Sequence, residues 1–290
     1  MKQVVTYAQN REDIIIDWFF KDRKTGFYID IGAGNPDIDT VTKLFYNKGW
    51  NGINVEPIDH IYRYINKRRK RDINLNIGVS NKSGKLSFRE YGTDGLSTFS
   101  NEMKEDYLDH PDNVTSKFID YQVDVVTLSQ IFKEHAKSIR VQFLKVDVEG
   151  YEYEVLAGND WKKNRPELLC IEANHVKHDW RPILLENEYV KAHHDGLNEY
   201  YVAAESSLPK VFDHVAAIIN REPIIHYKTK QSIDEYQTII QHKENHVKEL
   251  ETALVDVQQQ LEKIKTLRSH IAETGRSRLK RLSSGNNHEE

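Results

Sequence analysis

Short apolar runs alternate with segments of helical period along the first two thirds of the chain. The runs, rich in Ile, Val, Leu and Phe, predict buried strands, and apolar residues recurring every three to four positions predict amphipathic helices. We expect strands at 27–33, 52–56, 73–79, 141–147 and 168–173, and helices at 11–20, 37–48, 58–69, 151–157 and 180–188. Strands that alternate with helices favour an α/β fold with a mostly parallel sheet and right-handed crossovers.

Two parts of this region depart from the alternation. Residues 85–90 and 121–125 alternate polar and apolar side chains with period two and flank a polar stretch at 92–112. We interpret them as edge strands with a loop over the functional site. Residues 200–203 predict a last strand, paired as a hairpin with 189–193. A C-terminal antiparallel hairpin on a parallel sheet is typical of methyltransferases rather than of dehydrogenase Rossmann domains.

The pattern changes after residue 228. Apolar side chains recur with a strict 3.5-residue period from Ile233 to Ile271 over five heptads, with breaks at Lys243 and Arg268. Charged residues flank this stripe, and the combination predicts a long coiled-coil helix. We divide the chain into a domain at 1–228, a coiled-coil oligomerisation segment at 229–274 and a disordered basic and polar tail at 275–290.

A single helix with this stripe would expose a long apolar seam to water, so we expect a homo-oligomer. The mixture of Ile, Val and Leu in the seam leaves dimer and trimer open. The basic residues at 276–281 suggest at most peripheral contact with the inner face of a membrane.

Composition narrows the class of protein. Charged residues make up 30% and hydrophobic residues 38% of the 290 residues, and the mean hydropathy is −0.69, so part of the chain is expected to be extended. A net charge of −4 favours no polyanionic partner. The single cysteine, Cys170, excludes an internal disulfide, and we expect it in the core. Without a signal-peptide core or a long apolar run, the sequence predicts a cytoplasmic location.

The most informative segment is a glycine-rich turn that follows the first strand. Gly32, Gly34 and Asn35 come directly after an apolar run, a pattern in which backbone N–H groups approach a nucleotide cofactor. Glu56 ends the next strand, where an acid can accept hydrogen bonds from both ribose hydroxyls. Asp37 stands where a dinucleotide site needs a small residue, and an acid would repel a diphosphate. A cofactor with ribose and no phosphate, S-adenosylmethionine, fits better.

Acidic residues end two further predicted strands. Asp147 and Glu149 follow the fourth strand, and Glu172 and His175 follow the fifth. Because the carboxyl ends of parallel strands meet at one edge of the sheet, these side chains should converge. Each alone could cap a helix or pair with a lysine, but converging carboxylates need a cation or a polar ligand. We expect Asp147, Glu149 and His175 to be catalytic. If the enzyme uses a metal, Asp147 and Glu172 are its expected ligands and magnesium or calcium the expected ion; a metal-free mechanism is the alternative.

The sequence also resembles a known family. Six blocks carry the resemblance: the opening Tyr7–Asp13, then Phe27–Gly34, Phe45–Pro57, Gly95–Thr98, Phe143–Gly150 and Asp195–Asn198. Over residues 5–215 the chain resembles the FkbM family of S-adenosylmethionine-dependent O-methyltransferases. Of these blocks, Lys-Val-Asp-Val-Glu-Gly is the most specific.

The resemblance implies a class I methyltransferase sheet and transfer of a methyl group to a hydroxyl. It also implies that Gln9 and Asp30 help to bind the cofactor beside the glycine loop. The variant resembles members that lie beside glycosyltransferases in bacterial surface-polysaccharide loci, which implies a glycan substrate in O-antigen or capsule biosynthesis and a glycosyltransferase partner.

Other functions remain to be weighed against this one. A DNA amino-methyltransferase would carry an Asn/Asp-Pro-Pro-aromatic motif after the fourth strand, and Cys170 lacks the preceding proline of a cytosine methyltransferase. The basic run at 67–71 ends a predicted helix, where cations favour the helix dipole, so we interpret it as a solvated helix end without nucleic acid. The alternative is an inactive scaffold or regulatory subunit whose coiled coil is its function.

Overall fold

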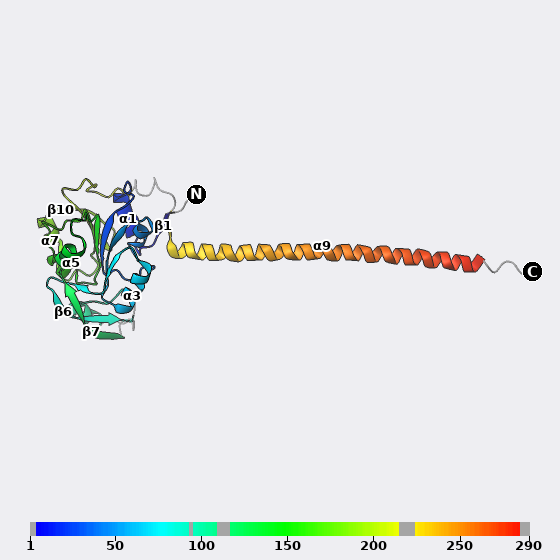
Figure 1. Cartoon of the computed structure of the whole chain (residues 1–290), viewed down its shortest axis with the longest axis horizontal. Coiled ribbons are helices and arrows are strands. Elements are labelled where there is room, and N and C mark those ends of the chain that lie inside the picture. The colour runs from blue at the N-terminus through cyan, green and yellow to red at the C-terminus, as the bar shows by residue number, and fades with distance from the viewer. Residues whose placement is uncertain (1–3, 93–94, 109–116, 215–223, 285–290) are drawn as a thin grey trace, which may run out of the picture. The chain divides into compact units, whose positions relative to one another are not determined.

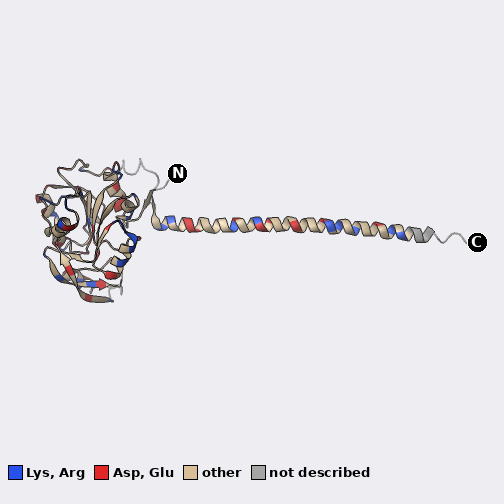
Figure 2. Cartoon of the chain, viewed as in Figure 1, with Lys and Arg blue, Asp and Glu red and all other residues tan. Residues whose placement is uncertain are grey.

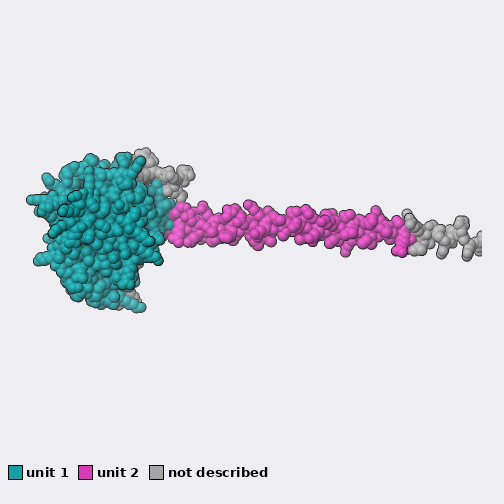
Figure 3. Space-filling model, viewed as in Figure 1, with its two compact units in different colours: residues 1–227 teal, residues 228–290 magenta. Residues whose placement is uncertain are grey.

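The structure, a computed structural model, describes residues 4–92, 95–108, 117–214 and 224–284. The chain divides into two units, residues 1–227 and 228–290 (Figure 3), and each is described by itself. The polar stretch predicted at 92–112 and the predicted tail therefore lie partly outside the described residues.

The first unit contains a seven-stranded sheet (Figure 1). Its strands in spatial order are β10 (Tyr189–His194), β11 (Asn198–Ala203), β9 (Leu168–Glu172), β8 (Phe143–Val146), β2 (Phe27–Ile31), β3 (Asn51–Val55) and β4 (Ile73–Leu75). The strands from β9 to β4 are parallel, whereas β11 is antiparallel to both of its neighbours. This order, with its C-terminal antiparallel hairpin, confirms the predicted class I methyltransferase fold.

Seven helices of the described residues belong to this unit: α1 (Glu12–Phe19), α2 (Lys43–Asn47), α3 (Asp59–Arg68), α4 (Asn101–Asp106), α5 (Leu128–His135), α6 (Glu152–Ala157) and α7 (Arg181–Glu186). The predicted helices at α1, α3, α6 and α7 are confirmed. Helices α4 and α5 were not predicted, although each begins at a residue that caps it: the side chains of Ser100 and Thr127 accept hydrogen bonds from first-turn N–H groups.

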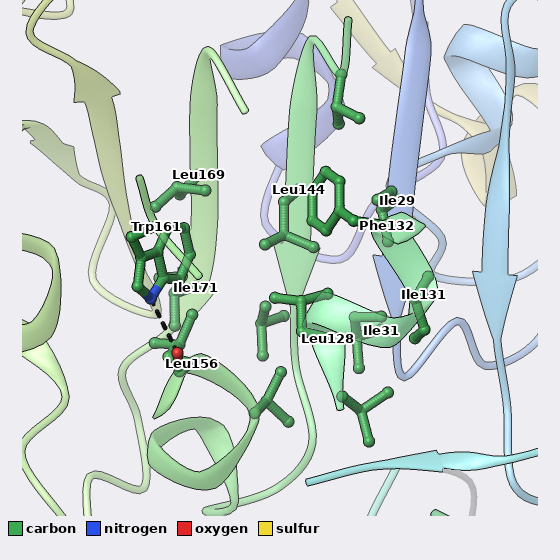
Figure 4. Packing of buried hydrophobic residues seen from close by; sticks show 14 of the residues in the cluster. Ile29, Ile31, Leu128, Ile131, Phe132, Leu144, Leu156, Trp161, Leu169 and Ile171 are labelled. Atoms are coloured by element: carbon green, nitrogen blue, oxygen red, sulfur yellow. Dashed lines mark hydrogen bonds between the residues drawn. The ribbon is translucent and has the colours of Figure 1, made fainter. Parts of the chain in front are cut away.

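Alternate residues of each strand pack on opposite faces of the sheet. On one face, Leu144, Leu169 and Ile171 belong to a buried cluster that includes the apolar side chains of α5 (Figure 4), and Trp161 donates a hydrogen bond to the carbonyl of Leu156 at 2.9 Å. The other face buries a cluster rich in aromatic rings, which includes Tyr28, Phe45, Trp50 and Phe143. Cys170 is buried in this second layer, as predicted.

The prediction of one continuous strand at 73–79 is wrong, because the segment forms two short strands in different sheets. The chain leaves the main sheet after β4, where the amide of Asn76 donates to the carbonyls of Glu56 and Pro57. It then forms β5 (Gly78–Val79) in a separate sheet, ordered β5-β7-β6, with β6 (Gly84–Tyr91) and β7 (Phe118–Val126). The segments predicted as edge strands at 85–90 and 121–125 are thus confirmed as strands, and they pair with each other in this separate sheet.

The helix predicted at 37–48 is also wrong over its first half, because only α2 is helical. The N–H of Thr40 bonds to the carbonyl of Tyr7, and Asp39 has a φ of 48°, so the backbone cannot form helical bonds there. Two short strands at the ends of the unit, β1 (Val4–Thr6) and β12 (Ile224–His226), pair in parallel and were not predicted.

The second unit is helical: α9 (Tyr227–Ser284) begins at the unit boundary. Its apolar heptad side chains are exposed, and charges of both signs are distributed along it (Figure 2). The disorder predicted from residue 275 is wrong as far as Ser284, because the helix continues through Gly275, and residues 285–290 lie outside the described residues. Among the described residues, no helix combines the length and apolar character needed to cross a bilayer.

Candidate cofactor and catalytic site

A cavity of about 450 Å³ lies at the carboxyl ends of the parallel strands. This is where ligands bind in open α/β sheets, and its volume is in the range of small-molecule sites. The cavity is lined by nine of the predicted site residues: Gln9, Gly32, Gly34, Asn35, Glu56, Asp147, Glu149, Glu172 and His175. Asp30, predicted to bind the cofactor, does not line it. The segment at 95–99 contributes to the wall, as expected for a loop over the site.

The glycine-rich turn is held tightly between two strands. The N–H groups of Gly32 and Ala33 both donate to the carbonyl of Val55 at 3.1 Å. Gly32 has a φ of 76°, and a Cβ atom at this position would lie 1.9 Å from the backbone oxygen of Asp147. Only glycine fits here, because the turn after β2 passes directly over the turn after β8.

Glu56 lies beside this turn with its carboxylate buried. Its two oxygens accept hydrogen bonds from the N–H groups of Gly34 at 3.0 Å and Ile58 at 2.8 Å. Burial raises the pKa of Glu56 to about 7. A carboxylate has about four lone-pair positions, so two N–H donors leave room for two further donors from the cavity, such as the hydroxyls of a ribose.

Lys145 connects the turns after β2 and β8, a role that the sequence analysis missed. Its ammonium donates to the carbonyl of Gly32 at 2.8 Å and lies 3.4 Å from a carboxylate oxygen of Asp30 and 3.3 Å from one of Asp147. Burial disfavours its charge, but Asp147 and Asp30 outweigh this effect and raise the pKa of Lys145. Asp30, which also accepts a hydrogen bond from the Thr42 hydroxyl, therefore positions Lys145 from behind the cavity instead of facing a ligand.

Glu149 is aimed by an unusual turn. It has a φ of 53°, a left-handed conformation that costs on the order of 1–2 kcal/mol for a residue other than glycine. The turn is held because Glu152 accepts hydrogen bonds from the N–H groups of Val148 and Gly150, and the Thr98 hydroxyl donates to the carbonyl of Glu149. Backbone strain of this kind is concentrated at functional sites.

Glu149, Glu172 and His175 meet in the cavity, with one donor atom from each within 4.8 Å of the others. Burial and the neighbouring charge of Asp147 raise the pKa of both glutamates, whereas burial and Lys177 lower the pKa of His175. The predicted convergence of acids thus occurs. Of the predicted ligand pair, Glu172 belongs to this group, and Asp147 pairs with Lys145 while also lying beside the carboxyl group of Glu172.

Two polar residues of the cavity were not predicted. Glu12 at the start of α1 is buried and accepts a hydrogen bond at 3.0 Å from the amide of Asn198 at the start of β11. Burial raises the pKa of Glu12. Asn198 and Glu12 lie in two of the blocks that carry the family resemblance. Their presence in those blocks was the sequence signal that could have identified them as site residues.

The cavity has two chemically different ends. The ends of β3 and β9 are three strand spacings apart, roughly 14 Å. Near β3, Glu56 is accompanied by apolar and aromatic side chains such as Ile58, Phe88 and Phe99. Near β8 and β9 the lining is acidic and polar. The apolar end suits a flat base next to a ribose, and the polar end suits a hydrophilic reactant.

The interpretation of Asp37 and of the basic run needs correction. Asp37 does not line the cavity; it pairs with Lys43 at 2.6 Å and Arg68 at 2.7 Å, so it gives no reason to exclude a diphosphate. In the basic run, Arg69 is buried and donates to the carbonyl of Pro36, and Arg71 stacks on Tyr46. Arg69 and Arg71 therefore hold the glycine loop and α2, whereas Lys67 and Arg68 form the exposed, basic last turn of α3 that was predicted.

Comparison with known proteins adds independent information. The methyltransferase FkbM domain model matches residues 30–194. No curated protein sequence matches the chain. The solved structures that resemble it include the METTL16 methyltransferase domain, with 11% identity, a TM-score of 0.38, and coverage of 68% of this chain and 67% of that one.

Proposed function

Because the chain belongs to the FkbM methyltransferase family, we propose that it transfers the methyl group of S-adenosylmethionine to a hydroxyl group of a sugar. The observation that carries this proposal is the cavity itself, which places a ribose-competent carboxylate at its β3 end and a group of acids with a histidine at its β8–β9 end. The matched family region, residues 30–194, includes the carboxylate of Glu56 and the acids and histidine of the β8–β9 end.

The residues of the cavity fit the cofactor. Glu56 would accept the ribose hydroxyls, and the apolar side chains beside it would cover the base. Gly32, Gly34 and Asn35 let the backbone approach the rest of the cofactor, and Gln9 also lines the cavity. When bound, S-adenosylmethionine supplies a methyl group that forms a C–O bond with the acceptor as its own C–S bond breaks, leaving S-adenosylhomocysteine.

We assign Asp147 as the general base that accepts the proton of the acceptor hydroxyl. It lies where the glycine turn meets the acidic end, and its carboxylate is about one third exposed to the cavity and fixed by Lys145. The proton lost by the hydroxyl passes to this carboxylate and then to water. Glu149 and His175 line the same end and bind the acceptor, so the main contribution of the protein is to align the oxygen with the methyl group.

The polar lining supports a hydroxylated acceptor. Asn174, Asn198 and Glu12 surround the acidic end and offer donors and acceptors for several hydroxyl groups. With the resemblance to members of surface-polysaccharide loci, this favours a growing bacterial glycan, made at the cytoplasmic face of the membrane with a glycosyltransferase partner. We therefore assign the protein to the methylation of glycan in O-antigen or capsule biosynthesis.

We also propose that α9 of one chain packs against α9 of a second copy of the protein, in a parallel coiled coil. From Tyr236 on, the apolar heptad side chains are exposed by half or more, for example Leu254 by 57% and Val257 by 52%. Identical helices present identical stripes in register, so self-association buries the whole seam. The alternative, in which the coiled coil is the function and the first unit is inactive, predicts no binding of S-adenosylmethionine.

Mass spectrometry of surface glycan tests the proposed function. Glycan from a strain without the gene should be lighter by one CH₂ group per modified sugar, and restoring the wild-type gene should restore the mass. Unchanged glycan would contradict the sugar assignment. Calorimetry with S-adenosylmethionine on the full-length protein separates the enzyme from the scaffold: absence of heat at millimolar ligand would support the scaffold.

A further inference from the structure

Among the described residues, no lysine or arginine forms an ion pair with Glu149 or Glu172, the two acids of the group that they form with His175. Lys145, which lines the same cavity, is shared between Asp30 and Asp147, and Lys177 pairs with Asp106. His175 is the basic member of the group, with its Nε2 atom 4.0 Å from a carboxylate oxygen of Glu149. Two carboxylates thus face one imidazole in a largely buried place, an arrangement that is costly without a further positive charge.

An independent feature of Glu172 points into the same space. Its side chain is more than nine tenths buried, and its Oε2 atom has no hydrogen-bond partner among the described residues. Buried carboxylate oxygens are nearly always satisfied, so an acceptor without a donor on a member of this group indicates a ligand.

We propose that Glu149, Glu172 and His175 bind one divalent transition-metal cation. Carboxylate oxygens suit Mg²⁺, Ca²⁺ and Mn²⁺, whereas imidazole suits later first-row metals, so the mixed set favours Mn²⁺ or a similar ion over Mg²⁺. This assignment replaces the pair Asp147 and Glu172, which the sequence suggested for magnesium. Asp147 remains with Lys145.

The distances are compatible with one ion. Donor atoms bound to the same metal at about 2.1 Å lie roughly 3.0–4.2 Å apart. The three donor atoms lie within 4.8 Å of one another, so rotations that move them by about half an ångström would complete the site. The Tyr107 hydroxyl donates to Glu149 at 3.2 Å and fixes that ligand, while the amide of Asn174 lies 3.3 Å from Nε2 of His175 and would have to yield it.

A second histidine with two neighbouring glutamates differs from the first group in its geometry. His178 lies 3.2 Å from Glu154 and 3.5 Å from Glu102, so it has the same composition. The two carboxylates face opposite nitrogens of its ring, however, and cannot meet at one ion. The ring of His178 is about half exposed. The His178 group therefore serves as a matched control for the proposed metal site.

The role of the ion rests on the proposed function. Metal coordination lowers the pKa of a bound hydroxyl group, and a sugar hydroxyl is otherwise a poor proton donor to a carboxylate such as Asp147. The binding of the ion does not depend on that function, so the two can be tested separately.

Titration of the full-length protein with Mn²⁺, followed by electron paramagnetic resonance near neutral pH, tests the site. Wild type should bind one Mn²⁺ per chain in the first unit, and Glu172→Gln, which keeps the side-chain shape, should bind at least about tenfold more weakly. Glu154→Gln should bind like wild type. Circular dichroism would verify that both variants are folded, and His175→Gln serves as a second ligand variant.

Equal Mn²⁺ binding by wild type and Glu172→Gln would overturn the site, as would absence of binding by wild type. Titration with S-adenosylmethionine without metal distinguishes the two proposals. If the cofactor binds and Mn²⁺ does not, only the metal site fails; if Mn²⁺ binds and the cofactor does not, only the proposed function fails.

Discussion

Substitution of Glu56 by glutamine removes one acceptor oxygen and leaves the shape of the side chain unchanged. In the wild type, both oxygens already accept backbone N–H groups, at 3.0 Å from Gly34 and 2.8 Å from Ile58. In Glu56→Gln, the amide oxygen can serve one of these donors, and the amide NH₂ faces the other. One buried N–H group therefore loses its acceptor, which should lower the free energy of unfolding by about 1–3 kcal/mol.

The same change weakens the cofactor site. A hydrogen bond from a ribose hydroxyl to an ionised carboxylate contributes about 1.5–3 kcal/mol, so losing one should reduce affinity for S-adenosylmethionine by about 10- to 100-fold. Isothermal titration calorimetry on the full-length protein measures this directly. Asp37→Asn is the matched control, because that acid lies next to the glycine turn but does not line the cavity; its affinity should stay within about threefold.

The dependence on pH gives a second readout of Glu56. Burial raises its pKa to about 7, so between about pH 4.5 and 7 the native state holds a proton that the unfolded state releases. Its contribution to stability is present at the acidic side and is lost as pH rises through 7. Binding that requires the ionised form should weaken as pH falls below 7, and Glu56→Gln should lack this component. A folded Glu56→Gln that binds within twofold of wild type on both sides of pH 7 would refute the reasoning.

Three further changes test other parts of the structure. Gly32→Ala places a Cβ 1.9 Å from the backbone oxygen of Asp147 and should lower the free energy of unfolding by at least about 2 kcal/mol in a denaturant titration; an unchanged midpoint would contradict the close packing of the two turns. Asp147→Asn should abolish turnover while affinity for S-adenosylmethionine stays within about tenfold, because proton removal and ribose binding use different strands. Val257→Asp in the heptad seam should dissociate the oligomer in light scattering, whereas Val255→Asp, equally exposed but outside the seam, should not; a wild-type monomer would refute the coiled coil.

The glycine turn and the acids at the strand ends were predictable because each is local. An apolar strand followed by glycines sets the turn, and any residue just beyond a parallel strand reaches the same edge of the sheet. Glu56, Asp147, Glu149 and Glu172 were therefore placed at the cavity from sequence alone.

What the sequence did not predict depends on register and tertiary contacts. Asp30 and Lys145 are partners in the register of β2 and β8, and only that pairing reveals that Asp30 holds the lysine from behind the cavity. Likewise, the start of α2 is set by bonds from Thr40 to Tyr7 and from Thr42 to Asp30, which override the helical period of the segment.

Transfer of labelled methyl is the measurement closest to the central claim. The full-length protein would be incubated with S-adenosylmethionine labelled in its methyl group and with glycan purified from a strain that lacks the gene. The account predicts label in the glycan as a methyl ether on a sugar hydroxyl, formed by the wild type and not by Asp147→Asn. Glycan without label, or equal labelling by both proteins, would contradict it.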